Sequence, residues 1–93
     1  MTILDLKALL GAAIKAQRST LGISQEELGN RAGLHRTYVS DVERGARNPS
    51  LQSVEKLAKA LELSVSMLFQ RATHDREQET VHEGSSGREI RRR

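Results

Sequence analysis

The sequence contains no cysteine and no tryptophan, and only one tyrosine and one phenylalanine among its 93 residues. Without cysteine, disulfides and thiolate metal sites are excluded, and a reducing compartment, the cytoplasm, is the natural location. The scarcity of aromatic residues leaves leucine, isoleucine, valine and alanine as core material, which suits a small helical protein. A chain this short accommodates one domain of modest stability, which a partner subunit would strengthen.

Long apolar runs are also missing. The apolar stretch at residues 3–14 is interrupted by Asp5 and Lys7, and no basic segment precedes it. It therefore predicts an amphipathic helix rather than a targeting peptide, and no segment approaches the length of a transmembrane span. We expect no membrane partner.

The residue patterns of enzymes and metal sites are absent as well. No serine–histidine pair sits on a scaffold that would align it, no glycine-rich phosphate loop occurs, and the carboxylates are predicted on surface helices. His74 and His82 fall in a stretch with no packing pattern and have no cysteine beside them, which makes a poor metal site. We expect neither enzymatic activity nor a metal or other cofactor.

The sequence does have a mild excess of positive charge. The formal net charge is +3 and the isoelectric point is near 9.8, which is compatible with nucleic-acid binding. Residues 34–49 carry three arginines against two acidic residues, and residues 70–93 carry six arginines against five. Most of the arginines are therefore concentrated in these two segments.

Apolar residues recur at helical spacing in five segments. The predicted helices cover roughly residues 4–20, 24–32, 35–44, 49–62 and a short stretch after 64. Ser24 and Glu27 form a capping box at the start of the second helix. Gly33 permits the left-handed turn that a tight corner between the second and third helices requires. The inward-facing residues expected of the fourth helix are Leu51, Val54, Leu57, Ala58 and Leu61.

The helical pattern stops near residue 72. Residues 73–93 contain two isolated apolar residues, Val81 and Ile90, among many charges of both signs. Such a composition cannot bury enough apolar surface to order itself. The sequence thus predicts one helical domain over residues 4–70 and a flexible, charged tail over residues 71–93.

A series of motifs resembles one known family. The chain is similar to the lambda-repressor/Cro-like helix-turn-helix family, also called the XRE family, over residues 10–69. The motifs that carry the resemblance are the run from Ile14 through Arg18 to Gly22, Ser24-Gln-Glu-Glu-Leu, Ala32-Gly-Leu, Arg36-Thr-Tyr-Val-Ser, Glu43-Arg-Gly, Asn48-Pro-Ser-Leu and Leu57-Ala-Lys-Ala-Leu. The Arg36 block resembles restriction–modification controller proteins and short phage-type repressors in particular.

The resemblance implies an all-α, compact five-helix domain and a transcription regulator that binds double-stranded DNA as a dimer. Two residues depart from the family's pattern. His35 replaces the small hydroxyl residue that usually caps the recognition helix. Gly29 replaces an alanine, which lowers helix propensity by roughly 1 kcal/mol but allows the second and third helices to pack closely.

In this motif the start of the third helix enters the major groove. Arginine suits guanine O6 and N7, the methyl group of threonine suits thymine, and a carboxylate accepts from cytosine N4. The residues expected to read bases are Arg36, Thr37, Ser40 and Asp41. Asp41 has the alternative role of orienting Arg36 or Arg44.

A second group of polar residues is expected to contact the DNA backbone, which adds affinity and salt dependence rather than sequence information. These residues are Gln25, His35, Tyr38, Arg44, Arg47 and Asn48. Gln25 lies at the start of the second helix, where free N–H groups favour an anion. For His35 the alternative is that it only caps its helix.

Two further sets of residues have structural roles. In this family the positions of Arg18 and Glu43 commonly pair, which ties the first helix to the end of the third. The fifth helix has more apolar residues than one small helix needs, so part of it is expected at a two-fold interface. The candidate interface residues are Leu63, Val65, Met67 and Phe69.

The preferred hypothesis is a cytoplasmic, nucleoid-associated transcriptional regulator, a repressor or autoregulator, that binds a near-palindromic operator as a homodimer. Its half-sites would lie about 34 Å apart, one helical turn of DNA. The alternative is an antitoxin or protein-interaction module whose tail or fifth helix binds a partner protein and folds on binding.

Overall fold

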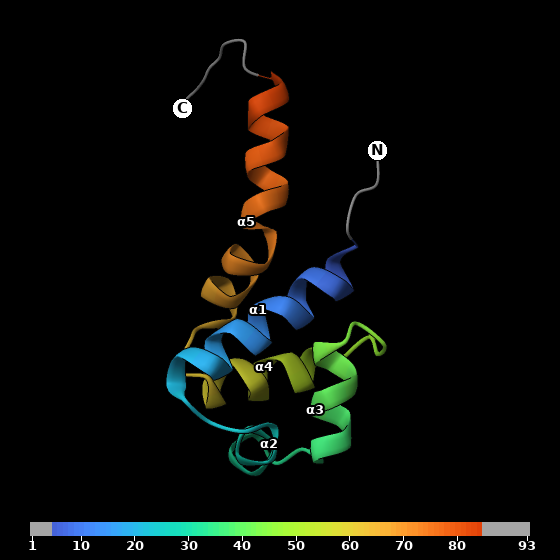
Figure 1. Cartoon of the computed structure of the whole chain (residues 1–93), viewed down its shortest axis with the longest axis vertical. Helices are drawn as coiled ribbons and strands as arrows, with labels where there is room; N and C mark the ends of the chain where they lie inside the picture. Colours follow the sequence, from blue (N-terminus) through green and yellow to red (C-terminus); the bar gives the residue numbers. More distant parts are fainter. Residues whose placement is uncertain (1–4, 85–93) are drawn as a thin grey trace.

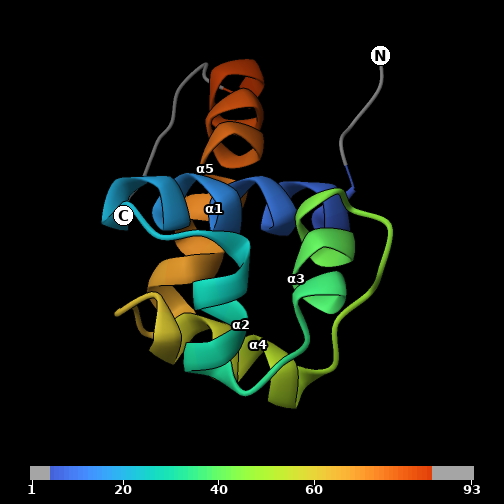
Figure 2. The ribbon, with the colours of Figure 1, turned by 60° about the horizontal axis from the view of Figure 1, so that its bottom comes forward.

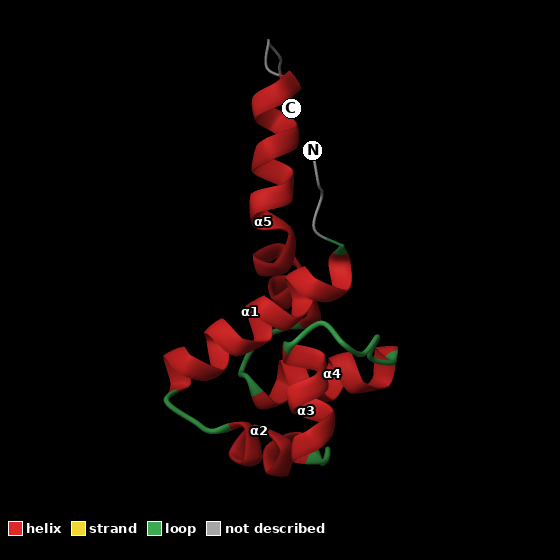
Figure 3. Ribbon diagram, turned by 45° about the vertical axis from the view of Figure 1, so that its right-hand side comes forward, coloured by secondary structure: helices red, strands yellow, loops and turns green. Residues whose placement is uncertain are grey.

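The computed structural model describes residues 5–84, and their side chains as far as residue 74. These residues form five α-helices and no strand (Figures 1 and 3). The helices are α1 (Leu6–Leu21), α2 (Gln25–Ala32), α3 (Arg36–Glu43), α4 (Leu51–Ala60) and α5 (Val65–Gly84). The predicted all-α, five-helix class is confirmed.

Each of the first four helices begins where a side chain accepts a free backbone N–H. The Ser24 hydroxyl accepts from the Glu27 amide at 3.0 Å, and the Asp5 carboxylate accepts from the Ala8 amide at 2.9 Å. The capping box is only half confirmed, because the Glu27 carboxylate accepts from Arg31 Nε at 3.0 Å instead of reaching back. Since Arg31 lies one turn along the same face, its cation competes for the carboxylate.

The helices pack pairwise around one core. α1 contacts α5 and α3, α2 contacts α3 and α4, and α4 contacts α5. Figure 2 shows α2 and α3 together on the side of the domain away from the projecting half of α5. The fold therefore presents the α2–α3 pair at one end and the projecting half of α5 at the other.

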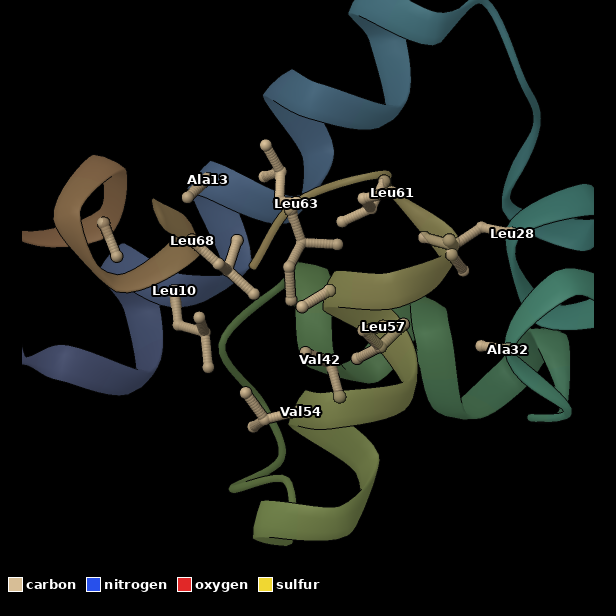
Figure 4. Close-up of a cluster of buried hydrophobic side chains, with 14 of the residues drawn as sticks. Leu10, Ala13, Leu28, Ala32, Val42, Val54, Leu57, Leu61, Leu63 and Leu68 are labelled. Carbon is tan, nitrogen blue, oxygen red and sulfur yellow. The ribbon is translucent and has the colours of Figure 1, made fainter. Parts of the chain in front are cut away.

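The core is built from aliphatic side chains of all five helices, as Figure 4 shows. The fully buried large residues are Ile14, Leu28, Leu57, Leu61, Leu68, Val39 and Val42. Burying each such side chain contributes about 1.5–3 kcal/mol, so the aliphatic core stabilises the fold without aromatic residues. Because Val39 and Val42 belong to this core, the opposite face of α3 is directed outward.

The fourth helix differs from its prediction at one residue. Leu51 was expected to face the core, but it is 82% exposed. The helix begins at Leu51 and its first core residues are Ser53 and Val54. Leu51 lies one turn before the first buried residues of α4, beyond the edge of the core, although it continues the helical spacing of the apolar residues.

The fifth helix is longer than expected. It continues to Gly84, and its C-terminal half projects from the domain in Figure 1. The expected domain boundary between residues 70 and 71 falls inside α5, and Ala72 beyond it is buried. Apolar periodicity did not predict this extension, because a helix rich in arginine, glutamate and glutamine propagates on backbone hydrogen bonds and propensity. Of the predicted tail, residues 85–93 lie outside the described residues.

Candidate nucleic-acid interface

The turn between α2 and α3 brings the two helices into close contact. Gly33 has a φ of 71°, as expected for a residue that ends α2 in the left-handed conformation. The Leu34 amide donates to the Gly29 carbonyl oxygen at 2.8 Å. A Cβ on Gly29 would lie 2.6 Å from the Leu34 carbonyl oxygen, so alanine at this position would push the turn outward. The close packing predicted from Gly29 is confirmed.

The outer face of α3 holds the residues expected to read bases. Arg36 and Thr37 are exposed in the first turn, and Ser40 and Asp41 are half-buried one turn later. The Arg36 guanidinium has neither an ion pair nor a hydrogen bond within the part of the chain that the structure describes. Its five N–H donors are therefore available to an acceptor in a groove.

His35 caps α3. Its Nδ1 accepts a hydrogen bond from the Thr37 amide at 3.2 Å, and the residue has the extended backbone of an N-cap. In the neutral ring this places the proton on Nε2, which points away from the cap as a donor. The two roles weighed for His35 are thus compatible.

Tyr38 and Arg47 lie against each other. Tyr38 packs partly buried on the core, and the guanidinium carbon of Arg47 lies 4.9 Å from the centre of its ring. This cation–π contact orders an arginine that otherwise belongs to an exposed loop. Asn48, also expected at the DNA backbone, is exposed on the same loop.

Asp41 has cationic partners on the same surface. Arg44 Nη2 lies 2.5 Å from Asp41 Oδ1, and Arg47 Nε lies 4.0 Å from Asp41 Oδ2. Two roles were considered for Asp41, reading a base and orienting a neighbouring arginine. The structure contains the contact with Arg44 that the second role requires. No such contact joins Asp41 to Arg36 among the described side chains.

The predicted pair of Arg18 and Glu43 is confirmed. Arg18 Nε and Nη2 donate to the two carboxylate oxygens of Glu43 at 2.7 and 3.1 Å, and Arg18 Nη1 donates to the Ile23 carbonyl oxygen at 2.9 Å. The side chain of Glu43 is 3% exposed. The hydrogen bonds to Glu43 raise the pKa of Arg18 above its usual range and outweigh the opposing effect of burial.

Gln25 belongs to the same network, which sequence reasoning missed. Its Nε2 donates to Glu43 Oε1 at 3.0 Å. An amide nitrogen carries two hydrogens, so the second remains available to another acceptor at the start of α2. The carboxylate therefore orients Gln25 as well as Arg18.

Two other structural residues were also missed. Gly11 lies where α1 crosses the end of α3, and a Cβ there would be 2.3 Å from the Val42 carbonyl oxygen. Gln17 is buried, donating to the Leu61 carbonyl oxygen at 3.0 Å and accepting from Arg71 Nη1 at 2.5 Å. A glycine inside an amphipathic pattern was the only available signal for Gly11.

The candidate dimer residues fall into two environments. Val65 and Met67 are 38% and 43% exposed at the start of α5, and Phe69 packs at the edge of the core. Leu63, also expected at the interface, is a core residue with 8% exposure, so it offers almost no surface to a partner. Its position just before α5 directs it inward with Leu61 and Leu68 (Figure 4).

Residues 5–74, whose side chains are described, contain no cluster of three or more histidine, aspartate or glutamate residues that could bind a metal. Among the described helices, none combines the length and apolar character of a membrane span.

Comparison with known proteins agrees with this geometry. A helix-turn-helix family model matches residues 14–68, which is more than half of the chain. The chain belongs to the helix-turn-helix family. The matching proteins of this family are transcriptional regulators and control proteins, and the family is not one of enzymes. The chain is therefore a helix-turn-helix DNA-binding transcriptional regulator.

Controller proteins are prominent among the relatives of this regulator. Control protein C.SmaI from Serratia marcescens is 43% identical over 68 residues, which cover 73% of this chain and 81% of that protein. The crystal structure of the restriction-modification controller protein C.AhdI from Aeromonas hydrophila matches with a TM-score of 0.64 and 43% identity, over 66% of this chain and 92% of that one. The controller protein C.Esp1396I matches with a TM-score of 0.73 and 32% identity, over 82% and 99% of the two chains.

Proposed function

We propose that this regulator binds a near-palindromic operator as a homodimer and reads it with the outer face of α3. The observation that carries the proposal is the division of α3 into two faces. Val39 and Val42 are buried in the core, whereas Arg36 and Thr37 are exposed in the first turn. A helix held this way at one end of a domain presents its N-terminal residues to base edges.

Each polar residue of this surface has a proposed role that its chemistry supports. Arg36 offers two parallel N–H donors to guanine O6 and N7, Thr37 offers a methyl group to thymine, and Ser40 offers a hydroxyl one turn further on. The surrounding donors bind phosphates and set the docking position. These backbone contacts are assigned to Gln25, His35, Tyr38, Arg44, Arg47 and Asn48.

We place the proposed dimer contact at the start of α5. Val65 and Met67 are exposed apolar residues at the start of α5, a helix that packs against α1 and α4 and whose second half projects away from α2 and α3 (Figure 2). A two-fold axis there would present two recognition helices to half-sites about 34 Å apart on one face of DNA. Such an operator is a near-palindrome, and occupancy of it would block or recruit RNA polymerase in the cytoplasm.

The relatives favour a controller-type role within this class. C.SmaI is named a control protein, and C.AhdI and C.Esp1396I are restriction-modification controller proteins. Solved variants of C.Esp1396I replace an arginine, a threonine and a tyrosine at consecutive positions. The order is that of Arg36, Thr37 and Tyr38 here.

The test begins with a selection of bound duplexes from a random pool, which yields the operator. Arg36→Ala is then compared with the unmodified protein by gel shift on the operator and on single-base variants. Because a bidentate arginine–guanine contact is worth about 1–3 kcal/mol, Arg36→Ala should lose that much at one base pair per half-site and relax the preference there. Arg36→Lys, which keeps the charge but not the fork, should lose most of the same preference.

Arg31→Ala is the matched control, because Arg31 is an exposed arginine of α2 that pairs with Glu27. It should leave the sequence preference unchanged. If Arg36→Ala weakens binding to the operator and to random duplexes equally, α3 does not read bases through Arg36.

A further inference from the structure

Asp41 places a negative charge among the cations that the proposed function assigns to phosphates. It touches Arg44 directly at 2.5 Å and lies 4.0 Å from Arg47. The side chains of Arg44 and Arg47 are 63% and 52% exposed, so both can reach a DNA strand. The carboxylate therefore occupies the position that a phosphate oxygen would take beside them.

The loop after α3 keeps these groups together. The Ala46 amide donates to the Asp41 carbonyl oxygen at 2.9 Å, and the Gly45 amide donates to the Val42 carbonyl oxygen at 3.0 Å. Gly45 has a φ of 73°, and a Cβ on it would lie 3.2 Å from Ala8 Cα on α1. This tight turn brings Arg47 back over Tyr38 and beside the carboxylate.

Two physical consequences follow for DNA binding. Asp41 cancels about one of the two charges of Arg44 and Arg47, so fewer counterions are released when any duplex binds. It also restrains the guanidinium of Arg44, which can then contact a phosphate only where the DNA strand passes close to the end of α3. Both effects act on the part of affinity that does not depend on sequence.

We propose that Asp41 is a specificity-determining residue that suppresses binding to random DNA by holding Arg44 and Arg47. The inference rests on the proposed function, because it assumes that α3 docks in a major groove. In that complex the docking position is set by base contacts, and the five-donor fork of Arg44 holds Asp41 and one phosphate at the same time. On a random duplex the phosphates lie at variable positions, and Arg44 must leave Asp41 to reach them.

The test compares Asp41→Asn with the unmodified full chain on two probes, the selected operator and a random-sequence duplex of equal length. The matched control is Glu55→Gln, which removes one negative charge from an exposed position on α4. Binding is measured by fluorescence anisotropy between about 50 and 200 mM salt, where the phosphate contribution is largest. Thermal unfolding of both variants confirms that they fold.

Asp41→Asn should bind the random duplex about threefold to tenfold more tightly than Glu55→Gln, with a salt slope steeper by about 0.9 for each subunit. Operator affinity should rise less, so that the ratio of operator to random affinity falls. Adding Arg44→Gln to Asp41→Asn should remove most of the increase in affinity for the random duplex, because Arg44, once released from Asp41, makes the additional phosphate contact.

Two results would overturn the inference while leaving the proposed function intact. In one, the unmodified protein prefers its operator and Asp41→Asn binds random DNA no better than Glu55→Gln does. In the other, Asp41→Asn loses operator affinity at a single C·G pair, which would make Asp41 a base reader. If the unmodified protein shows no operator preference, the proposed function itself fails.

Discussion

At the scale of single residues, one buried carboxylate joins three parts of the molecule. Glu43, at the end of α3, accepts from Arg18 on α1 and from Gln25 at the start of α2. Because its side chain is almost completely buried, its charge depends on these donors for stabilisation. The position of α3 relative to α1 and α2 is therefore set partly by the hydrogen bonds to Glu43.

Arg18→Met is expected to lower the free energy of unfolding by about 3 kcal/mol, because it leaves the buried carboxylate of Glu43 without a cation. Arg31→Met provides the comparison, since Arg31 pairs with Glu27 at 3.0 Å and with Glu62 at 3.9 Å but all three side chains are exposed. Each such exposed pair is worth less than about 1 kcal/mol. Urea unfolding of both variants measures the difference, and equal losses would contradict the assigned role.

Glu62 is a second residue with an energetic consequence. It follows α4 with a φ of 65°, in the left-handed region that residues with a Cβ avoid. Glu62→Gly should therefore raise the free energy of unfolding by about 1 kcal/mol, because glycine adopts this conformation without strain. Glu55→Gly, inside α4, should lower it by about 1 kcal/mol through helix propensity. A loss of stability in both variants, measured by chemical denaturation, would show that Glu62 is not strained.

At the scale of elements, the crossing of α1 and α3 depends on the absence of a side chain. Gly11 lies against the carbonyl oxygens of Val42 and Glu43, at the end of α3. The backbones approach there more closely than any residue with a Cβ permits. Glycine at this position thus brings Arg18, two turns along α1, within reach of Glu43.

Gly11→Ala should lower the free energy of unfolding by about 2 kcal/mol, because a methyl group forced against backbone atoms makes the helices shift. Helix propensity alone predicts the opposite sign, an increase of about 1 kcal/mol in the free energy of unfolding. Gly22→Ala is the control: its φ is 70° but nothing lies near its missing Cβ, so only backbone strain applies. Thermal unfolding decides the sign, and a stabilised Gly11→Ala protein would mean that the close contact is absent.

At the scale of the whole molecule, the proposed reading surface and the proposed dimer interface use different helices. α2 and α3 form one end, and the projecting part of α5 forms the other (Figure 1). The hydrogen bonds from Arg71 to Gln17 and from Gln17 to the Leu61 carbonyl oxygen join α5, α1 and the end of α4. In a dimer through α5, this connection would fix the angle between the two-fold axis and the recognition helices.

Met67→Glu should weaken dimerisation by about tenfold or more, because it places a charge in an apolar interface. The monomer should remain folded, since Met67 is 43% exposed whereas Leu68 and Phe69 still pack inward. Ser66→Glu, on the same helix turn, is the control with the same charge and should have a smaller effect. Sedimentation velocity measures the assembly state.

Gel shifts with one and two half-sites complete this test. The Met67→Glu protein should keep its single half-site affinity and lose the advantage of the second half-site. A dimer that persists in the Met67→Glu protein would place the interface elsewhere on the surface.

How far the sequence predicted this molecule depended on the range of the interaction. Helix number, Ser24 as a cap and Gly33 as a turn were predictable because they depend on neighbours within four residues. The length of α5 was not, because its second half lacks the apolar periodicity on which the prediction relied. Leu51 and Leu63 were misplaced because spacing specifies a helix face but not where the core begins or ends along it.

The sequence by itself determined the fold class, the turn between α2 and α3 and the outward placement of Arg36 and Thr37, because a strong family motif and local helix geometry suffice for these. The contacts of Asp41 with Arg47, of Gln25 with Glu43 and of Gly11 with the end of α3 were decided only by the tertiary structure. Each joins residues whose spacing in the chain specifies neither distance nor direction. Packing of the helices supplies both, and with them the balance of charge at the surface that we propose contacts DNA.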